Sequence, residues 1–106
     1  MAGPRNKVLL IGWDAADWKV ITPLLDSGQM PHLAKLVEAG VMGNITTLQP
    51  VLSPMLWNSV ATGMLADRHG ILGFTEVDPA TGLVRPVTST SRKVKALWNI
   101  LGQEGY

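Results

Sequence analysis

The stretch Lys7-Val-Leu-Leu-Ile-Gly-Trp-Asp14 is a run of apolar residues that ends on a carboxylate. Its residues do not alternate between apolar and polar, which is typical of a strand buried on both faces of a parallel sheet. A second strand is predicted at residues 43–48, Gly-Asn-Ile-Thr-Thr-Leu, because β-branched residues favour strands and Pro50 ends the run. We therefore expect an α/β fold with a parallel sheet.

Two helices are expected between these strands. From Asp17 to Gly28 the apolar residues repeat with a helical period, and Pro23 inside this stretch predicts a kink or two short helices. From Pro31 to Gly40 a second helix is predicted, since proline suits the first helical position and glycine the position after the last.

The second half of the chain predicts two more helices and a hairpin. Ser53 as N-cap, Pro54 at the first helical position and Gly63 at the end indicate a short helix. Residues 77–83 predict a hairpin with a glycine-containing loop. We expect Ser91 to cap a last helix, whose apolar positions repeat every three or four residues and include Trp98.

Composition excludes several classes of protein. The 106 residues are 46% hydrophobic and 16% charged, which predicts a packed core rather than a disordered chain. The net charge of +1 without a basic stripe argues against binding to nucleic acid or to an anionic membrane surface. The lack of cysteine excludes disulfides, thiolate metal sites and a cysteine nucleophile. We expect a soluble, cytoplasmic chain, because neither a membrane span nor a signal peptide is recognisable.

The last helix bears on how much of a domain is present. Its apolar stripe needs a sheet to cover, and no strand follows it. We therefore expect residues 7–106 to be part of a larger domain, preceded by a flexible lead-in at residues 1–6. The alternative is that the helix packs back on the strands already present.

Two residues are candidates for chemistry, and each has a structural alternative. Asp14 follows the first strand, where open α/β sheets bind ligands and where a carboxylate can hold a divalent cation. An aspartate there can equally cap the next helix. Ser53 begins a helix, whose free N–H groups stabilise an alkoxide or a phosphate, but it also suits a plain N-cap. A serine hydroxyl needs a base or a metal, and His32 and His69 are the only histidines. A metal held by Asp14 is thus the more economical way to activate Ser53.

Two blocks of sequence together resemble a known family. The first is residues 7–18 with Gly28-Gln-Met-Pro-His-Leu33 and Gly40, and the second is residues 50–63 with Asp67-Arg-His-Gly-Ile71. In this order they resemble the opening of the type I phosphodiesterase/nucleotide pyrophosphatase group of the alkaline phosphatase superfamily. The resemblance covers nearly the whole chain.

The resemblance implies an alkaline-phosphatase-like α/β/α sandwich, present only in part, and makes residues 7–106 the N-terminal portion of a metal-dependent hydrolase. Asp14 matches a metal-binding aspartate, and Ser53 matches the nucleophile, which is also a metal ligand. Two divalent ions, usually Zn²⁺, are implied, with their remaining ligands outside this chain. The implied substrates are small phosphodiesters, phosphomonoesters or related esters, attacked through a covalent intermediate. The 106 residues alone are expected to be inactive.

The resemblance has one clear departure. Nucleotide pyrophosphatases place an asparagine soon after the His-Gly pair, whereas the aligned position here is Phe74, which predicts a different substrate arrangement. A phosphomutase-type phosphotransferase of the same superfamily and a non-catalytic binding or scaffold domain remain alternatives. The oligomeric state is left open.

Overall fold

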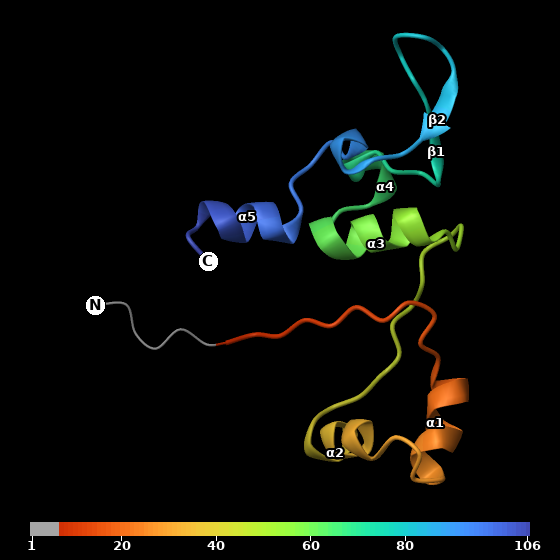
Figure 1. Cartoon of the computed structure of the whole chain (residues 1–106), viewed down its shortest axis with the longest axis vertical. Coiled ribbons are helices and arrows are strands. Elements are labelled where there is room, and N and C mark those ends of the chain that lie inside the picture. Colours follow the sequence, from red (N-terminus) through yellow and green to blue (C-terminus); the bar gives the residue numbers. More distant parts are fainter. Residues whose placement is uncertain (1–6) are drawn as a thin grey trace. The chain divides into compact units, whose positions relative to one another are not determined.

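The computed structural model describes residues 7–106, which divide into two compact units between Asn44 and Ile45 (Figure 1). The lead-in predicted at residues 1–6 lies outside the described residues. The first unit contains α1 (Trp18–Asp26) and α2 (Pro31–Ala39). The second contains α3 (Ser53–Thr62), α4 (Ala66–His69), β1 (Thr75–Val77), β2 (Val84–Pro86), the 3₁₀ turn η1 (Ser89–Ser91) and α5 (Leu97–Gln103).

Helix α1 begins where the sequence supplies a cap. The Asp17 carboxylate accepts a 2.8 Å hydrogen bond from the Lys19 backbone N–H, which satisfies one of the unpaired donors of the first turn. The helix runs through Pro23 without dividing into two, although proline cannot donate the hydrogen bond expected at that position. The prediction of two short helices is therefore wrong.

The end of α1 shows why a glycine follows it. Gly28 has φ +73°, a left-handed conformation that costs glycine little. Its N–H bonds to the Leu25 carbonyl at 3.0 Å, and the Gln29 N–H bonds to the Leu24 carbonyl at 2.9 Å. This pair of bonds is a Schellman motif, and it confirms the predicted end of the helix.

Helix α2 has the expected start and a different end. Pro31 lies in its first turn, as predicted. Gly40, however, is extended at φ −119° and ψ −152°, so it does not supply a left-handed cap. A Cβ at Gly40 would lie 2.9 Å from the Leu36 carbonyl oxygen. Glycine is therefore needed here because the two backbone segments lie close together. The chain after α2 is tied to α1 by the Trp18 indole N–H, which donates to the Gly43 carbonyl at 3.1 Å.

Helix α3 starts one residue earlier than predicted. Leu52 is the extended N-cap, and its carbonyl accepts the Leu56 N–H at 3.0 Å. Ser53 is thus the first helical residue and not the N-cap, which corrects the prediction. Gly63 ends the helix as expected, with φ +67° and its N–H bonded to the Ser59 carbonyl at 2.9 Å.

The predicted hairpin is confirmed. Strands β1 and β2 pair antiparallel, with Val77 opposite Val84, and Gly82 adopts φ +71° in the loop between them. Across the hairpin, Arg85 Nε lies 2.9 Å from a Glu76 carboxylate oxygen. This is the only sheet among residues 7–106.

The predicted parallel sheet is not seen in the described part of the chain. Residues 7–13 and 43–48 form no strand, and the side chains of residues 8–11 are 70 to 88% exposed. A strand inside a sheet is hydrogen-bonded to a neighbour on each side, and the described residues provide no such neighbours for these two segments. The fold-class prediction is therefore wrong about the sheet for residues 7–106.

The last helix also differs from its prediction. Helix α5 begins at Leu97 after an Ala96 N-cap, so Ser91 does not cap it. Instead the Ser91 hydroxyl accepts the Thr88 N–H at 3.0 Å and donates to Glu76 at 2.7 Å. Residues 7–106 provide no parallel sheet for this helix to cover, and Trp98, expected in the core, is 59% exposed.

Little of the apolar composition is buried. The expectation of a packed core is met only by small clusters, because the buried apolar residues of the described chain are Ile21 in the first unit and Met55, Ile71 and Ala96 in the second. None of the helices in residues 7–106 combines the length and the apolar character that crossing a membrane requires.

The glycine that ends α3 should be sensitive to substitution. Gly63→Ala forces alanine into a left-handed conformation and should lower the free energy of unfolding by about 1–2 kcal/mol. Gly102→Ala lies in α5 with open space for a Cβ and should raise it by about 0.5 kcal/mol. Urea unfolding followed by circular dichroism measures both; equal effects of the two variants would contradict the role given to Gly63.

Candidate functional site

Asp14 lies at a strained turn between the extended segment and α1. The next residue, Ala15, has φ +57°, which is unfavourable for a residue with a side chain. The Asp14 side chain is exposed. It is not the N-cap of α1, because Asp17 takes that position. The capping alternative for Asp14 is therefore wrong, and its carboxylate lies at the tip of the turn.

Ser53 lies at the N-terminus of α3. As the first residue of a ten-residue helix, it sits among N–H groups that have no partner within the helix, at the positive end of the helix dipole. Its side chain is half-buried. This position favours an anion or a developing negative charge next to the hydroxyl.

The two candidates belong to different units. Asp14 is part of the first unit and Ser53 of the second, and the structure defines each within its own unit. Within residues 7–106 no three histidine, aspartate or glutamate side chains gather in a way that could hold a metal ion. A complete metal site is thus not built from the described residues.

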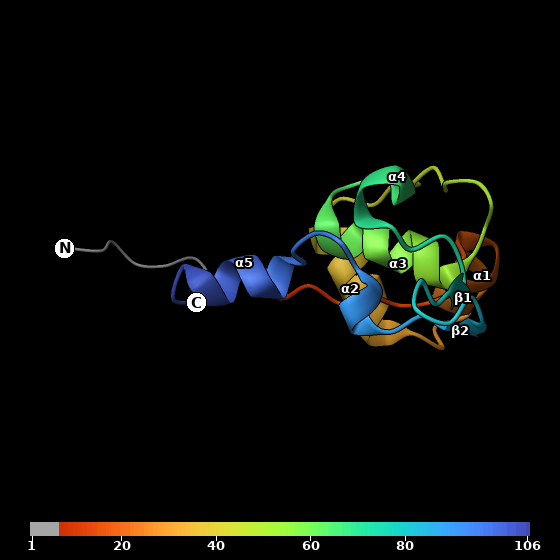
Figure 2. The ribbon, with the colours of Figure 1, turned by 90° about the horizontal axis from the view of Figure 1, so that it is seen from above.

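His69, at the end of α4, is the one charged or polar residue of residues 7–106 that is fully buried. Its Nε2 lies 3.1 Å from the Ser59 hydroxyl oxygen on α3, and its Nδ1 accepts a 3.0 Å hydrogen bond from the Ile71 backbone N–H. Helix α4 lies against α3 in both views of the ribbon (Figures 1 and 2). The imidazole therefore links α3 to the chain that follows α4.

The bonds of His69 determine its protonation. Because Nδ1 accepts a hydrogen bond, the proton of the neutral ring is on Nε2, which then donates to Ser59. A histidine that activates a serine needs the opposite tautomer, with Nε2 as acceptor and Nδ1–H held by a carboxylate. Ser59 and His69 thus form a structural pair and not a catalytic dyad. No signal in the sequence pairs these two residues, because their contact depends on how α3 and α4 meet.

Another hydroxyl of α3 is also used in the helix itself. Thr62 donates to the Asn58 carbonyl at 2.6 Å and accepts the Met64 N–H at 3.2 Å, both close to the end of α3. Such back-bonding holds the hydroxyl against its own helix. Among the hydroxyls of α3, the location at the helix N-terminus is particular to Ser53.

Comparison with known proteins assigns this sequence to a family. The model of the type I phosphodiesterase/nucleotide pyrophosphatase family matches residues 8–104. The chain belongs to this family. The resemblance seen in the sequence is thereby confirmed, and with it the placement in the alkaline phosphatase superfamily. No curated protein and no solved structure gives a significant match.

Membership of the family has a chemical meaning. Full-length members hydrolyse phosphoesters, and the family typically uses metal ions. The candidate donors here are a carboxylate and a hydroxyl, both oxygen ligands that suit a divalent cation such as zinc or magnesium. Zinc usually takes four ligands, so a zinc site would need further donors besides these candidates.

Burial of His69 makes the second unit sensitive to acid. Removal from water is the main effect and lowers the pKa of His69 below its ordinary value of 6.5. The charge of Arg92 also lowers this pKa. The charge of Asp67 and a hydrogen bond with the Met55 backbone raise it, but by less. Protonation would also place a proton on Nδ1, opposite the Ile71 N–H that now donates to it. The folded unit therefore favours neutral histidine.

The free energy of unfolding should fall as the pH drops below about 6.5, by at most about 1.4 kcal/mol per pH unit, because the unfolded chain takes up a proton that the folded chain resists. Urea unfolding at pH 7.5 and 5.5 measures this. The window lies above the range of Glu76 and Asp78, whose pKa values are lowered from 4.5 and 3.8, mainly by hydrogen bonds from Ser91 and from the Ala80 backbone.

Two variants serve as controls for this dependence. His69→Gln should be less stable at both pH values and should flatten the pH dependence. His32→Gln, at an exposed position of α2, should leave it unchanged. A wild-type protein equally stable at both pH values would contradict the assignment of neutral His69.

Proposed function

We propose that this chain supplies Asp14 and Ser53 to a metal-dependent phosphoester hydrolase in which Ser53 is the nucleophile. The observation that carries the proposal is the position of Ser53 at the N-terminus of α3 in a chain whose residues 8–104 match the phosphodiesterase family. A helix N-terminus favours the negative charge that an attacking hydroxyl and a phosphoryl group bring together.

The proposed reaction has two displacements at phosphorus. The Ser53 oxygen forms a bond to phosphorus while the bond from phosphorus to the ester oxygen breaks, and the departing alcohol gains the proton that Ser53 loses. Water then attacks the phosphoserine, which releases phosphate or a phosphomonoester and restores the hydroxyl. The N–H groups of the first turn of α3 stabilise charge on the phosphoryl oxygens during both steps.

Asp14 is the proposed metal ligand of the first unit. Its exposed carboxylate directly precedes Ala15, a residue in a left-handed conformation, and such strain is frequent at functional sites. Asp14 would hold a divalent cation, proposed as one of two zinc ions, and such an ion would supply Lewis-acid activation when bound. We propose that the remaining ligands lie outside residues 7–106, which agrees with the lack of a three-residue ligand cluster in that range.

The proposed substrates are small phosphoesters, bound differently from a nucleotide diester. Phe74 stands where the resemblance puts a supporting asparagine, and its side chain is 62% exposed. An aromatic ring cannot donate the amide hydrogen bond that an asparagine would give to a phosphoryl oxygen. This argues for a substrate whose phosphoryl group is held by other donors.

Removal of the Ser53 hydroxyl tests the nucleophile. In the full-length protein Ser53→Ala should lower kcat for a chromogenic phosphodiester or phosphomonoester by at least about 10³-fold, with an unchanged circular dichroism spectrum. Ser53→Thr, which keeps a hydroxyl, should retain measurable hydrolysis. Ser59→Ala makes the same change elsewhere in α3 and should keep hydrolysis at temperatures where it stays folded. If Ser53→Ala turns over like the wild type, another group is the nucleophile.

Replacement of the Asp14 carboxylate tests the metal ligand. Asp14→Asn should lower the bound metal per molecule, measured by mass spectrometry of the purified full-length protein, without changing its unfolding transition. Asp17→Ala removes the cap of α1 and should do the reverse: about 1 kcal/mol lower stability with unchanged metal content. Full metal content in Asp14→Asn would remove Asp14 from the metal site.

A further inference from the structure

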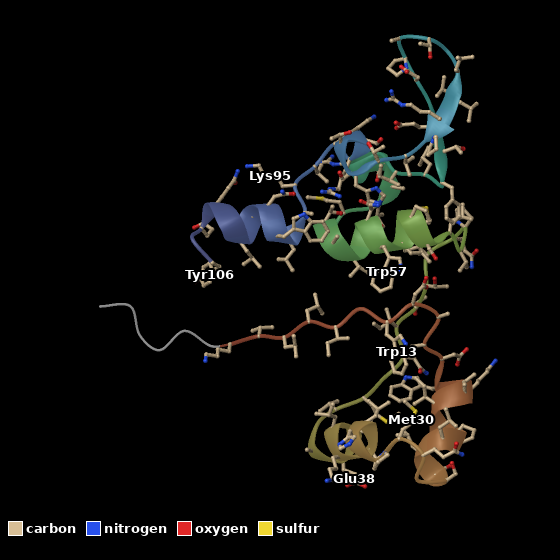
Figure 3. The ribbon with its side chains drawn as sticks, viewed as in Figure 1. Trp13, Met30, Glu38, Trp57, Lys95 and Tyr106 are labelled. Carbon is tan, nitrogen blue, oxygen red and sulfur yellow. The ribbon has the colours of Figure 1, made fainter. Side chains whose placement is uncertain are left out.

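The turn η1, the segment that follows it and the first turn of α5 line an open groove of about 470 Å³. It belongs entirely to the second unit, and Lys95 marks its position beside the start of α5 (Figure 3). Polar and cationic side chains dominate its lining, which includes Ser89, Arg92, Lys93, Lys95, Trp98 and Asn99. No residue assigned above to catalysis contributes to it.

The groove concentrates positive charge on a chain that is otherwise nearly neutral. Three of its lining residues are cationic and none is acidic, although the whole chain has a net charge of only +1. The ion pairs formed by residues 7–106 join Arg85 to Glu76 and Asp78, outside the groove. Neither ion pair involves a groove cation. Lys95 Nζ donates to the Gln103 amide oxygen at 2.8 Å, but this partner is neutral, so the charge of the three cations is not neutralised by it.

The Arg92 side chain contacts Trp98 and Asn58, but not all of its N–H donors have an acceptor. Its guanidinium carbon lies 5.3 Å from the centre of the Trp98 ring, and one terminal nitrogen reaches the Asn58 amide oxygen only at 3.4 Å. Its Nε is buried and has no hydrogen-bond acceptor. A buried donor without a partner is costly, and the planar guanidinium retains donors suited to the paired oxygens of an oxyanion.

Lys93 is anchored to the buried part of the unit. Its backbone N–H donates to the His69 carbonyl at 3.0 Å. Its side-chain stem crosses Gly70 so closely that a Cβ on that glycine would lie 2.9 Å from the Lys93 Cδ. Ala96, three residues on, is fully buried. The groove is therefore built on a fixed backbone and not on a loose surface loop.

We propose that this groove binds a phosphoryl oxyanion, either free phosphate or the phosphate of an ester, with Arg92 as its principal donor and Lys93 and Lys95 completing the charge. The aromatic face of Trp98 orients the guanidinium by a cation–π contact, and Asn99 offers a neutral donor at the edge. This site goes beyond the proposed hydrolysis and does not depend on Ser53.

The test is a titration of the full-length protein with inorganic phosphate at constant ionic strength, with sodium chloride as the exchanged salt. Two-dimensional amide NMR follows the residues from 89 to 99 and the indole N–H of Trp98. We expect saturable shifts confined to this segment, with a Kd on the order of 1 mM. Phenyl phosphate and dimethyl phosphate, titrated in the same way, distinguish an ester ligand from free phosphate by which of the three binds tightest.

Variants of the groove decide the outcome. Arg92→Gln should weaken phosphate binding at least about 10-fold, and Arg92→Lys should weaken it less, because the charge remains but the planar fork is lost. Lys93→Gln gives a second reading if Arg92→Gln does not fold. Arg85→Gln, also in the second unit but outside the groove, should bind as the wild type does. Shifts that chloride reproduces, or binding that survives both groove variants, overturn the proposal.

The same titration separates this proposal from the catalytic one. Ser53→Ala should bind phosphate in the groove with unchanged affinity. If Ser53→Ala loses phosphate binding while Arg92→Gln keeps it, the anion binds at α3, so the groove proposal fails while the hydrolase proposal stands. If Ser53→Ala keeps hydrolysis while Arg92→Gln loses phosphate binding, the proposal of Ser53 as nucleophile fails and the groove proposal stands.

Discussion

The imidazole of His69 is the interaction on which the second unit depends. It is fully buried, it donates to a hydroxyl of α3, and it accepts the amide of Ile71, so one ring joins two segments that share little other core. Its own carbonyl receives the Lys93 amide, which brings the chain before α5 to the same point. Both α3, which begins with Ser53, and the segment that lines the groove are thus hydrogen-bonded to this residue. A polar residue at such a junction specifies one arrangement because each of its bonds has a direction, whereas an apolar contact would allow several.

Local signals in the sequence predicted local structure well. Glycines at the ends of α1 and α3, proline in the first turn of α2 and the turn residues of the hairpin all act within a few residues, so their effect needs no tertiary partner. The apolar run at residues 7–13 is different. Its lack of alternation indicates burial on both faces, but burial depends on strands that the described residues do not provide, so its side chains are exposed. The predicted cap of the last helix differs for the same reason: Ser91 bonds to Glu76, fifteen residues away, and α5 begins after Ala96.

The candidate site likewise combines features that the sequence predicts with contacts that it does not predict. Motif order pointed to Asp14 and Ser53, and the structure explains their surroundings: Asp17 takes the cap of α1, and Leu52 that of α3, so neither candidate is needed as an N-cap. Nothing in the sequence pairs Ser59 with His69, or stacks Arg92 on Trp98, because these contacts depend on how helices meet. Arg92, Lys93 and Lys95 lie within four residues of one another, but only the structure shows that they line one groove.

The exposed run at residues 8–11 has a consequence for the behaviour of the chain in solution. Four large apolar side chains in succession, on a backbone that forms no strand, are a template for intermolecular strand pairing and fibril growth. Lys7 and Asp14 bracket the run with opposite charges, so antiparallel pairing of two copies would bring each lysine near the aspartate of the other copy, where the two attract. Because salt screens this attraction, and a net charge of +1 offers little repulsion, the electrostatic contribution to self-association should be strongest at low ionic strength.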